Sequence, residues 1–431
     1  MKNRIWLLLL LCLLLTGCAV PTVDQLYAVP ARPQSYSDMQ AVFDSAMEGL
    51  DYAAPRNGEN IQTIQMADLD GDGIREYLIF ARSDGDKSLK ILIFAQSGDR
   101  YVLTDTIACS GASFDRVEYA QMDGLGGTEL LVGTRISEQI YRSAVVYRYE
   151  AGKASLVLST SYVKYLTCDL NTDGLQELLV LKPGVTDRDR GAAALCWVSE
   201  GMGKRSDEVP LSCPVEQVDR ILPGELSDGA PSVFLSGVDP EAGVVTDVLA
   251  MDGQTLRNAA LESPTGTKVE KLGDYRLYPM DVDGDGVVEL PQLVKARDPN
   301  GALNQRLIRW YALDAKGRET DRGYTWHNFE NGWYLLLDDA WVPNLRISQE
   351  TDSAHFHQAD PETGNVEKIF SVYTLTGQNR EANAVIENRF MLHRGEQVIY
   401  AARLEVASGA LSISREDMIS RFRLVTQAWK S

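Results

Sequence analysis

Positive charge is scarce in this chain of 431 residues, which carries 42 Lys and Arg against 61 Asp and Glu, a formal net charge of -19. A surface of this sign repels phosphate backbones and anionic lipid surfaces, so we expect no nucleic-acid partner. Cations are the natural complement of such a chain.

Familiar catalytic motifs are missing as well. The sequence has no G-x-S-x-G, no H-E-x-x-H, no phosphate loop ending in Gly-Lys-Ser/Thr and no G-x-G-x-x-G that opens a helix. Paired catalytic carboxylates cannot be recognised in so acidic a chain, so glycoside hydrolysis is neither indicated nor excluded. Whether the chain is an enzyme stays open, and a role without catalysis is favoured.

Cysteine and histidine are sparse. The four cysteines after residue 18 form no C-x-x-C pair and no metal knuckle, which argues against zinc. They are Cys109, Cys168, Cys196 and Cys213. One or two disulfides and buried small hydrophobic side chains are both compatible with them. His355 and His357 would face the same side of a strand, but no third ligand stands at a recognisable spacing, so two surface histidines are favoured over a metal pair.

The only long apolar run lies at the start of the chain. Lys2 and Arg4 precede residues 5–15, and the run ends at Leu-Thr-Gly-Cys18. It is too short to span a bilayer, which takes about 20 residues, and its layout is typical of a secretory signal peptide. The Leu-Thr-Gly-Cys ending resembles the lipobox of bacterial lipoproteins. The resemblance implies a signal peptide over 1–17 and a lipid on Cys18; an ordinary signal peptide with an incidental cysteine is the alternative.

The next segment reads as a tether followed by a helix. Residues 18–36 contain three prolines and little apolar periodicity, as expected of a linker between lipid and folded body. Ser37 can cap a short amphipathic helix within 37–58, which we expect to pack on the main domain. The apolar positions of this helix are Met39, Val42, Phe43, Ala46 and Leu50.

An internal repeat dominates the sequence between residues 59 and 328. Acidic, glycine-rich segments beginning at Asp68, Asp169 and Asp281 are each followed by an apolar run, and weaker copies begin near 121 and 224. The spacing of roughly fifty residues is in the range of propeller blades. The sequence between these segments is typical of β-structure, with three to four short strands per period. We therefore predict a mainly β fold: a β-propeller of about five or more four-stranded blades, followed by a small α+β domain over 329–431.

The strong repeats supply oxygens at fixed offsets. Counting Asp68 as position one, side-chain oxygens stand at positions one, three, five and nine, and a peptide carbonyl stands at seven. Calcium takes six to eight oxygen ligands, so such a turn nearly completes a cage, and glycines at four and six let the chain curl. An EF-hand is excluded, because position twelve is Ile79, Val180 or Gln292 and strands flank the loops.

The arrangement resembles the FG-GAP and VCBS repeats of integrin α-type propellers. This resemblance implies calcium sites built from Asp68, Asp70, Asp72, Ile74 and Glu76, from Asp169, Asn171, Asp173, Leu175 and Glu177, and from Asp281, Asp283, Asp285, Val287 and Glu289. The weak copies have Gln121 and Leu125 in one and Gly224, Leu226 and Ser232 in the other, so we expect metal-free turns there. Plain Asp-Gly turns that join strands are the alternative for any one loop.

The segment after residue 329 loses the period. It contains several strand-like runs, and Ser414 to Asp417 has the form of a capping box that opens a final helix.

Together these features predict an exported lipoprotein, anchored by Cys18 to the outer face of the cell membrane, or to the outer membrane in a diderm host. Structural calcium would rigidify its propeller, which would bind or scaffold a protein or glycan. The alternative function is an extracytoplasmic polysaccharide hydrolase or lyase that uses the propeller channel.

Overall fold

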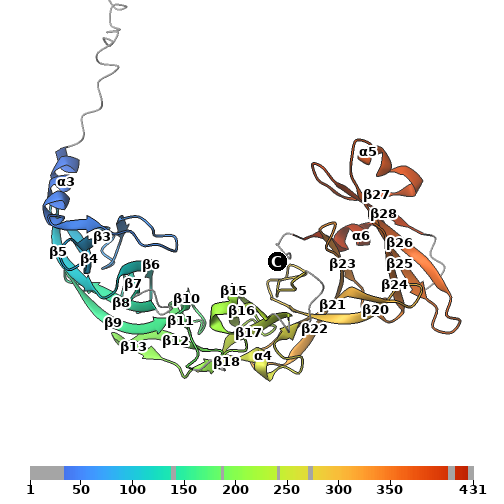
Figure 1. Ribbon diagram of the computed structural model, residues 1–431, viewed down its shortest axis with the longest axis horizontal. Coiled ribbons are helices and arrows are strands. Elements are labelled where there is room, and N and C mark those ends of the chain that lie inside the picture. The colour runs from blue at the N-terminus through green and yellow to red at the C-terminus, as the bar shows by residue number, and fades with distance from the viewer. Residues whose placement is uncertain are drawn as a thin grey trace, which may run out of the picture.

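The protein is described here from a computed structural model that covers residues 34–136, 142–185, 189–239, 243–269, 275–405 and 413–425. The described chain is mainly β and forms four antiparallel sheets of four or five strands and one sheet of ten strands. The sheets follow one another along an open arc, and the two ends of this arc lie apart (Figure 1). Cys18, the signal peptide and most of the tether lie outside the described residues.

The first sheet has the strand order β1-β3-β4-β5, with β2 also paired to β3. Its strands are β1 (Leu50–Tyr52), β2 (Ile64–Ala67), β3 (Glu76–Ser83), β4 (Leu89–Ser97) and β5 (Arg100–Cys109). Side chains alternate across its central strands. Leu78 and Phe80 face the second sheet, whereas Ile79 and Ala81 face the helix α3 (Gln34–Ala46). Because both faces are covered, the strand reads as a continuous apolar run rather than as an alternating one.

The next three sheets repeat this antiparallel meander. The second contains β6 (Ser113–Ala120), β7 (Glu129–Arg135), β8 (Arg142–Glu150) and β9 (Lys153–Tyr162). The third contains β10 (Lys164–Cys168), β11 (Glu177–Lys182), β12 (Ala192–Ser199), β13 (Met202–Arg205) and β14 (Val209–Pro210). The fourth, flanked by the short helices η1 (Val215–Gln217) and α4 (Ala259–Glu262), contains β15 (Val218–Glu225), β16 (Pro231–Asp239), β17 (Gly243–Asp252), β18 (Thr255–Asn258) and β19 (Lys268–Val269).

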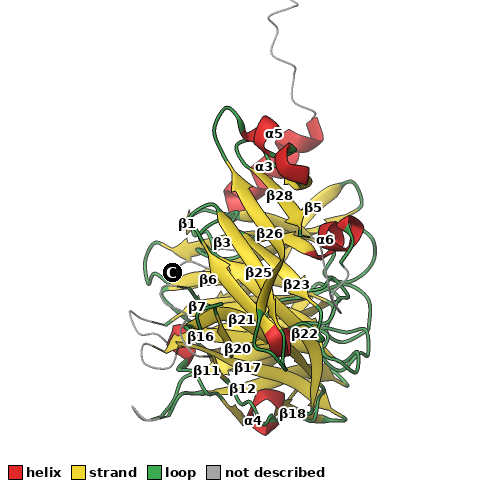
Figure 2. Ribbon diagram, turned by 90° about the vertical axis from the view of Figure 1, so that its right-hand side faces the viewer, coloured by secondary structure: helices red, strands yellow, loops and turns green. Residues whose placement is uncertain are grey.

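The last sheet has ten strands in the order β27-β28-β26-β25-β24-β20-β21-β22-β23-β29. They are β20 (Leu290–Arg297), β21 (Leu303–Leu313), β22 (Glu319–Asn328), β23 (Trp333–Leu337), β24 (Leu345–Gln349), β25 (Ser353–Ala359), β26 (Val366–Leu375), β27 (Phe390–Arg394), β28 (Ile399–Leu404) and β29 (Phe422–Leu424). Short helices lie between them: η2 (Val342–Asn344), α5 (Arg380–Asn383), η3 (Ile386–Asn388) and α6 (Arg415–Arg421). β20 and β24 join in parallel at Arg297 and Arg346. The boundary expected at 328 and 329 therefore falls within one continuous sheet (Figure 2).

The hydrophobic cores lie between consecutive sheets. One cluster joins the first and second sheets, one the second and third, one the third and fourth, and one the fourth and the ten-stranded sheet. Each sheet thus depends on its neighbours for burial, as in repeat proteins, whose end units need capping.

Both ends of the arc are capped. Phe43 of α3 and Met47, which follows this helix, pack on Leu92 and Phe94, which covers the first sheet on the side away from the second. At the other end, α6 and the strands β23 to β28 enclose a core that contains Trp326 and Phe356. In a closed propeller the last sheet would occupy the place that α3 takes here. The mainly β fold with repeated four-stranded sheets is confirmed, but these sheets do not meet in a closed wheel (Figure 1).

The expected helices are present with different bounds. The helix expected within 37–58 spans Gln34–Ala46, and Leu50 already belongs to a strand. The capping box at Ser414 and Asp417 is formed at the start of α6. That helix ends at Arg421, because Phe422 enters the strand β29 and pairs with β23. No helix among the described residues has the length and apolar character needed to cross a membrane.

The four cysteines of the folded body are free thiols. Burial raises the pKa of the Cys109 and Cys168 thiols to about 12 and of Cys196 and Cys213 to about 11. Of the two possibilities left by the sequence, the structure has free thiols: Cys109, Cys196 and Cys213 are buried and Cys168 is partly buried, as expected of small hydrophobic side chains that stay protonated.

Candidate metal centres

Five loops occupy equivalent places in successive sheets: each of the first four joins two antiparallel strands of its sheet, and the fifth leads from Met280 into β20. We name them loop 1 (68–76), loop 2 (121–129), loop 3 (169–177), loop 4 (225–230) and loop 5 (281–289). Backbone hydrogen bonds join loops 1 and 2, loops 2 and 3, and loops 4 and 5. The amide of Thr128 donates to the carbonyl of Asp68 at 3.1 Å, and the amide of Gln176 donates to the carbonyl of Gln121 at 2.8 Å. The loops therefore form a row along one edge of the arc.

Loop 4 aligns with the other loops one residue later than its glycines indicate. Leu226 is fully buried between sheets, as are Leu69 and Leu170 at position two of loops 1 and 3. The carbonyl of Glu225 accepts the amide of Val288 at 3.0 Å, which matches the contact of Asp68 with Thr128. Position one is thus Glu225 rather than Gly224, so Leu226 and Ser232 are not at positions three and nine.

The glutamate at position nine is buried in four of the loops. Glu76, Glu129, Glu177 and Glu289 are between 0% and 2% exposed. In each loop one carboxylate oxygen accepts the amide N–H of position two, at 2.8 Å from Leu69, 2.7 Å from Met122, 2.9 Å from Leu170 and 2.9 Å from Val282. This contact ties the loop to the strand that follows it. It gives the acid at position nine a structural role that a plain Asp-Gly turn would not require.

The aspartate at position one organises the turn. Its oxygens accept the amides of the glycines that curl the loop: Gly71 and Gly73 on Asp68 at 2.7 and 3.0 Å, and Gly284 and Gly286 on Asp281 at 2.6 and 3.0 Å. These glycines have φ between +77° and +94°, a region that side chains disfavour. The expected role of the glycines is confirmed.

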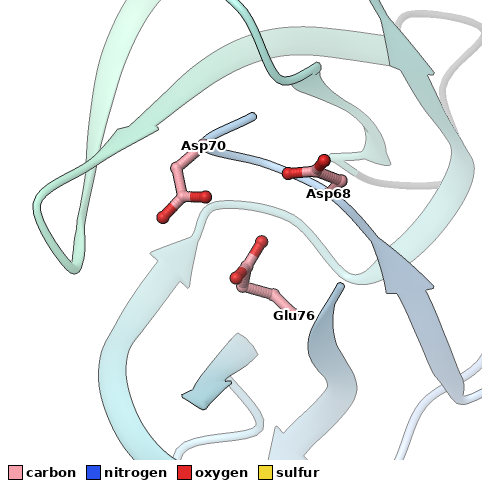
Figure 3. A group of neighbouring side chains, drawn as sticks. All are labelled: Asp68, Asp70 and Glu76. Carbon is pink, nitrogen blue, oxygen red and sulfur yellow. The ribbon is translucent and has the colours of Figure 1, made fainter. Parts of the chain in front are cut away.

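Three loops bring acidic oxygens within 4.8 Å of one another. The groups are Asp68, Asp70 and Glu76 in loop 1; Asp169, Asp173 and Glu177 in loop 3; and Asp281, Asp283 and Asp285 in loop 5. Figure 3 shows the first group, in which the three carboxylates converge although Glu76 comes from the start of β3. Carboxylate oxygens at this spacing are a suitable donor set for a hard cation such as calcium.

The other ligands expected from the repeat lie in the same loops but are not among the converging acids. Asp72 accepts the amide of Ile74 at 2.7 Å, and Asn171 hydrogen-bonds to Asp173. Leu175 and Val287 stand at position seven, and their amides donate to the acids at position five. That the carbonyls at position seven bind the ion stays a prediction.

Burial makes the position-nine glutamates weaker acids than an exposed glutamate. Desolvation and the charges of nearby aspartates raise the pKa of Glu76 and Glu177 to about 7 and that of Glu289 to about 8, although the backbone hydrogen bonds oppose this shift. A bound cation would offset both causes, because it replaces the lost hydration and neutralises the neighbouring acids.

Loop 2 is neutralised by a side chain. Arg148 on β8 places Nε 3.4 Å from Asp123, a carboxylate that is almost fully buried. Burial and the neighbouring Asp123 raise the pKa of Glu129 to about 7. Since Gln121 and Leu125 replace acids at positions one and five, the sequence leaves few metal ligands here, and Arg148 was not foreseen because it lies on a later strand.

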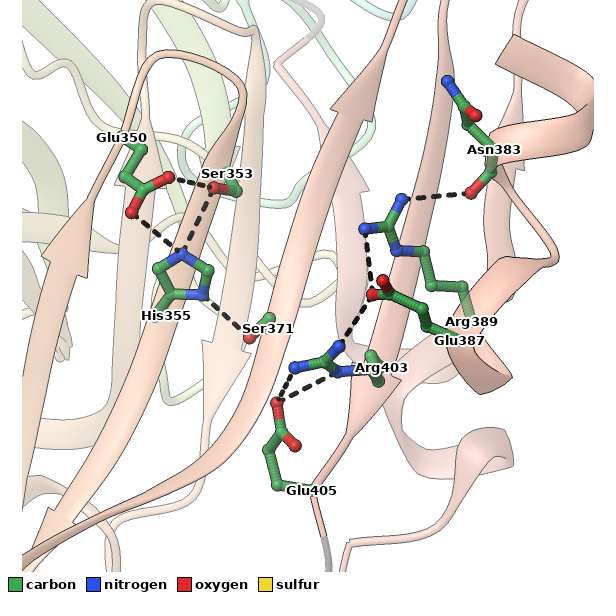
Figure 4. Close-up of polar contacts among 9 residues, drawn as sticks. All are labelled: Glu350, Ser353, His355, Ser371, Asn383, Glu387, Arg389, Arg403 and Glu405. Atoms are coloured by element: carbon green, nitrogen blue, oxygen red, sulfur yellow. Dashed lines mark hydrogen bonds and ion pairs between the residues drawn. The ribbon is translucent and has the colours of Figure 1, made fainter. Parts of the chain in front are cut away.

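The histidine pair is held by serines. His355 Nδ1 lies 2.8 Å from Ser371 Oγ, and its Nε2 lies 3.3 Å from Ser353 Oγ and 3.6 Å from Glu350 (Figure 4). His357 contacts Ser348. Among the described acids, cysteines and histidines, neither histidine belongs to a group that could hold a metal. Beside them, Arg403 bridges Glu387 and Glu405, so these charges satisfy one another.

No protein-family model matches the chain, and no curated protein matches it in sequence. Among solved structures, it is similar to the exotype rhamnogalacturonan lyase YesX, with 14% identity, 75% of this chain and 65% of the lyase covered, and a TM-score of 0.32. It is also similar to the rhamnogalacturonan lyase YesW, with 16% identity, coverage of 74% and 55%, and a TM-score of 0.32. A protein from Lactobacillus plantarum has 13% identity, coverage of 73% and 85%, and a TM-score of 0.29. The chain thus spans less than two thirds of the two lyases, and likeness at this level transfers neither fold nor activity.

Proposed function

We propose that this chain is a calcium-stabilised binding or scaffolding module, built from FG-GAP/VCBS-type repeats and anchored outside the cell through a lipid on Cys18. One observation carries the proposal: a buried, hydrogen-bonded glutamate meets two aspartates in both loop 1 and loop 3. Buried carboxylates without a nearby cation are costly, and a structural ion would remove that cost.

The position of the loops defines what the ion would do. Backbone hydrogen bonds join loops 1 and 2, loops 2 and 3, and loops 4 and 5, so an ion that rigidifies one of these loops also fixes a contact between two sheets. Since the arc has no ring closure, its stability depends on these nearest-neighbour contacts. The proposed role of calcium is therefore to hold the curvature on which a partner, a protein or a glycan, would be bound.

Calcium removal tests this proposal. Full-length protein treated with chelator is titrated with calcium by calorimetry while thermal melting is followed in parallel. A ligand that binds only the folded state at a hundred times its Kd adds about 2.7 kcal/mol, so we expect a clear rise in Tm with calcium and none with sodium. An unchanged Tm together with no binding heat would rule out the calcium role.

Lipid anchoring is tested separately. The chain is expressed with a radiolabelled fatty acid, and Cys18→Ser serves as the control. Label in the wild type and none in the variant is expected; label in neither would leave the chain without its proposed anchor.

A polysaccharide hydrolase or lyase remains the second candidate function. Two of the similar solved structures are rhamnogalacturonan lyases, which makes rhamnogalacturonan the natural first substrate to assay, although that likeness carries no argument about chemistry. Unsaturated ends or new reducing ends that appear only with active protein would establish this function in place of a purely binding one.

A further inference from the structure

We propose that Arg322 acts as an internal cation for loop 5, so that this loop takes calcium only when the guanidinium is displaced, at higher calcium concentration than loops 1 and 3. The inference rests on the proposed calcium binding and refines it, because it divides three loops of the same sequence pattern into two classes.

The three strong loops can be compared with one another, because they follow the same sequence pattern. In loops 1 and 3 the glutamate at position nine belongs to the group of converging acids. In loop 5 the group consists of Asp281, Asp283 and Asp285, and Glu289 is not part of it. Loop 5 has the same acids and glycines as loop 1 at every position of the pattern, so the difference between these two loops points to a group outside loop 5.

Arg322 is that outside element. It lies on β22, and its Nη2 is 3.0 Å from Asp285 Oδ2 while its Nε is 3.7 Å from Glu289 Oε1. Glu289 is fully buried. Its Oε1 and the Nε of Arg322 are both buried and make no hydrogen bond, so they act as charge partners for each other. The guanidinium thus holds two of the carboxylates that the repeat would offer to calcium.

Loops 1 and 3 have no such competitor. Among the residues that the structure describes, no Lys or Arg forms an ion pair with the acids of these two loops. Loop 2 shows the same device in a permanent form, since Arg148 pairs with Asp123 where two acids of the pattern have been lost. Loop 5 is intermediate, because it keeps every acid and also has the arginine.

Competition of this kind lowers apparent affinity. If the binding-competent form of a site is only a fraction of the population, the apparent Kd rises by the inverse of that fraction. Calcium affinity also follows the number of charged ligands and the rigidity of the site. Loops 1 and 3 should therefore fill first, and loop 5 should fill last.

Loop 5, the last site expected to fill, contacts the ten-stranded sheet. Tyr334 on β23 donates to the carbonyl of Val282 in loop 5 at 3.4 Å, and Arg322 lies on the adjacent strand. Displacing Arg322 therefore changes the contact between the loop and the ten-stranded sheet, so the C-terminal half of the arc responds to calcium in a range where loops 1 and 3 are already saturated.

Calorimetric titration of calcium into chelator-treated full-length protein tests this inference. The wild type should show two tight sites and one weaker site. Arg322→Gln should tighten the weak site by about tenfold or more and leave the tight sites unchanged, whereas Arg322→Lys, which keeps the positive charge, should leave it weak. Arg148→Gln is the matched control and should create no additional site, because Gln121 and Leu125 offer no acids.

The outcomes separate the two proposals. Absence of tight binding at loops 1 and 3 would overturn the calcium role itself. Tight binding there, with a third site of equal affinity that Arg322→Gln does not alter, would overturn the role of Arg322 alone, as would loss of the third site in that variant. Circular dichroism of Arg322→Gln in chelator shows whether its fold is intact, and Arg322→Lys provides an independent reading if it is not.

Discussion

The carboxylate of Glu177 accepts the amide N–H of Leu170 at 2.9 Å, and both residues are buried between sheets. The same contact recurs in loops 1, 2 and 5. The acid at position nine therefore stabilises the loop through this hydrogen bond, whether or not an ion is bound. The effect of its hydrogen bond can be measured separately from the effect of its charge.

Two substitutions at Glu177 distinguish these parts. Glu177→Gln keeps an oxygen for the Leu170 amide but removes the charge, so stability in chelator should be unchanged or higher, and the gain in Tm on adding calcium should shrink. Glu177→Ala leaves the buried amide unpaired and should cost about 1–3 kcal/mol with or without calcium. Glu129→Gln in loop 2 is the control and should not alter the calcium response; urea unfolding measures all three.

The pH dependence of the calcium-free protein follows from the raised pKa values. Glu76, Glu177 and Glu289 have folded pKa values of about 7 to 8, above their ordinary value of 4.5. The folded state then holds protons that the unfolded state has released. Their stabilising contribution is complete below about pH 4.5 and is lost as pH rises through 7 to 8.

We therefore expect the protein in chelator to be less stable at about pH 8 than at about pH 6, with the difference reduced by saturating calcium. Denaturant titrations at the two pH values with and without calcium measure this. A calcium-free stability that increases over that interval would contradict the assignment.

Strain in loop 3 offers a stabilising substitution. Thr172 occupies position four, where loops 1 and 5 have glycine, and its φ is +61°. A β-branched residue is disfavoured in this region by about 1–2 kcal/mol. Thr172→Gly should therefore stabilise the protein by up to about 1 kcal/mol after the added flexibility of the unfolded chain is included. Gly174→Ala, at a φ of +84°, should change stability in the opposite direction.

Close packing between loops is tested at Gly71. A Cβ at this position would lie 2.4 Å from the amide nitrogen of Gly127 in loop 2. Gly73 has a similar φ but open space around it. Both alanine substitutions introduce backbone strain, and Gly71→Ala should cost about 1–3 kcal/mol more than Gly73→Ala because only it forces the two loops apart. Equal losses in urea unfolding would show that the loops do not depend on this contact.

The helical cap is tested at Phe43, whose ring lies 4.6 Å from that of Phe94 and 5.3 Å from that of Tyr77. Phe43→Ala should cost about 3–5 kcal/mol and expose the first sheet, which an increase in binding of a hydrophobic dye would report. Ser45→Ala, at an exposed position of the same helix, should have little effect.

Several features could be predicted from the sequence because they depend on neighbours along the chain. The spacing of acids and glycines indicated the turns, the apolar runs after them indicated strands, and the pattern at Ser414 and Asp417 indicated the cap of α6. Turn chemistry and the two-residue period of strands are local properties, so they can be read without knowing which sheets meet.

The tertiary structure alone decided how the repeats assemble and which loops are free for a cation. Only three-dimensional packing places α3 over the first sheet, where a closing sheet would lie, and only it brings Arg322 and Arg148 to carboxylates on other strands. The cause is the same in both cases: side chains far apart in the sequence become partners through the stacking of sheets, and a charged group is stabilised by whichever partner that stacking provides.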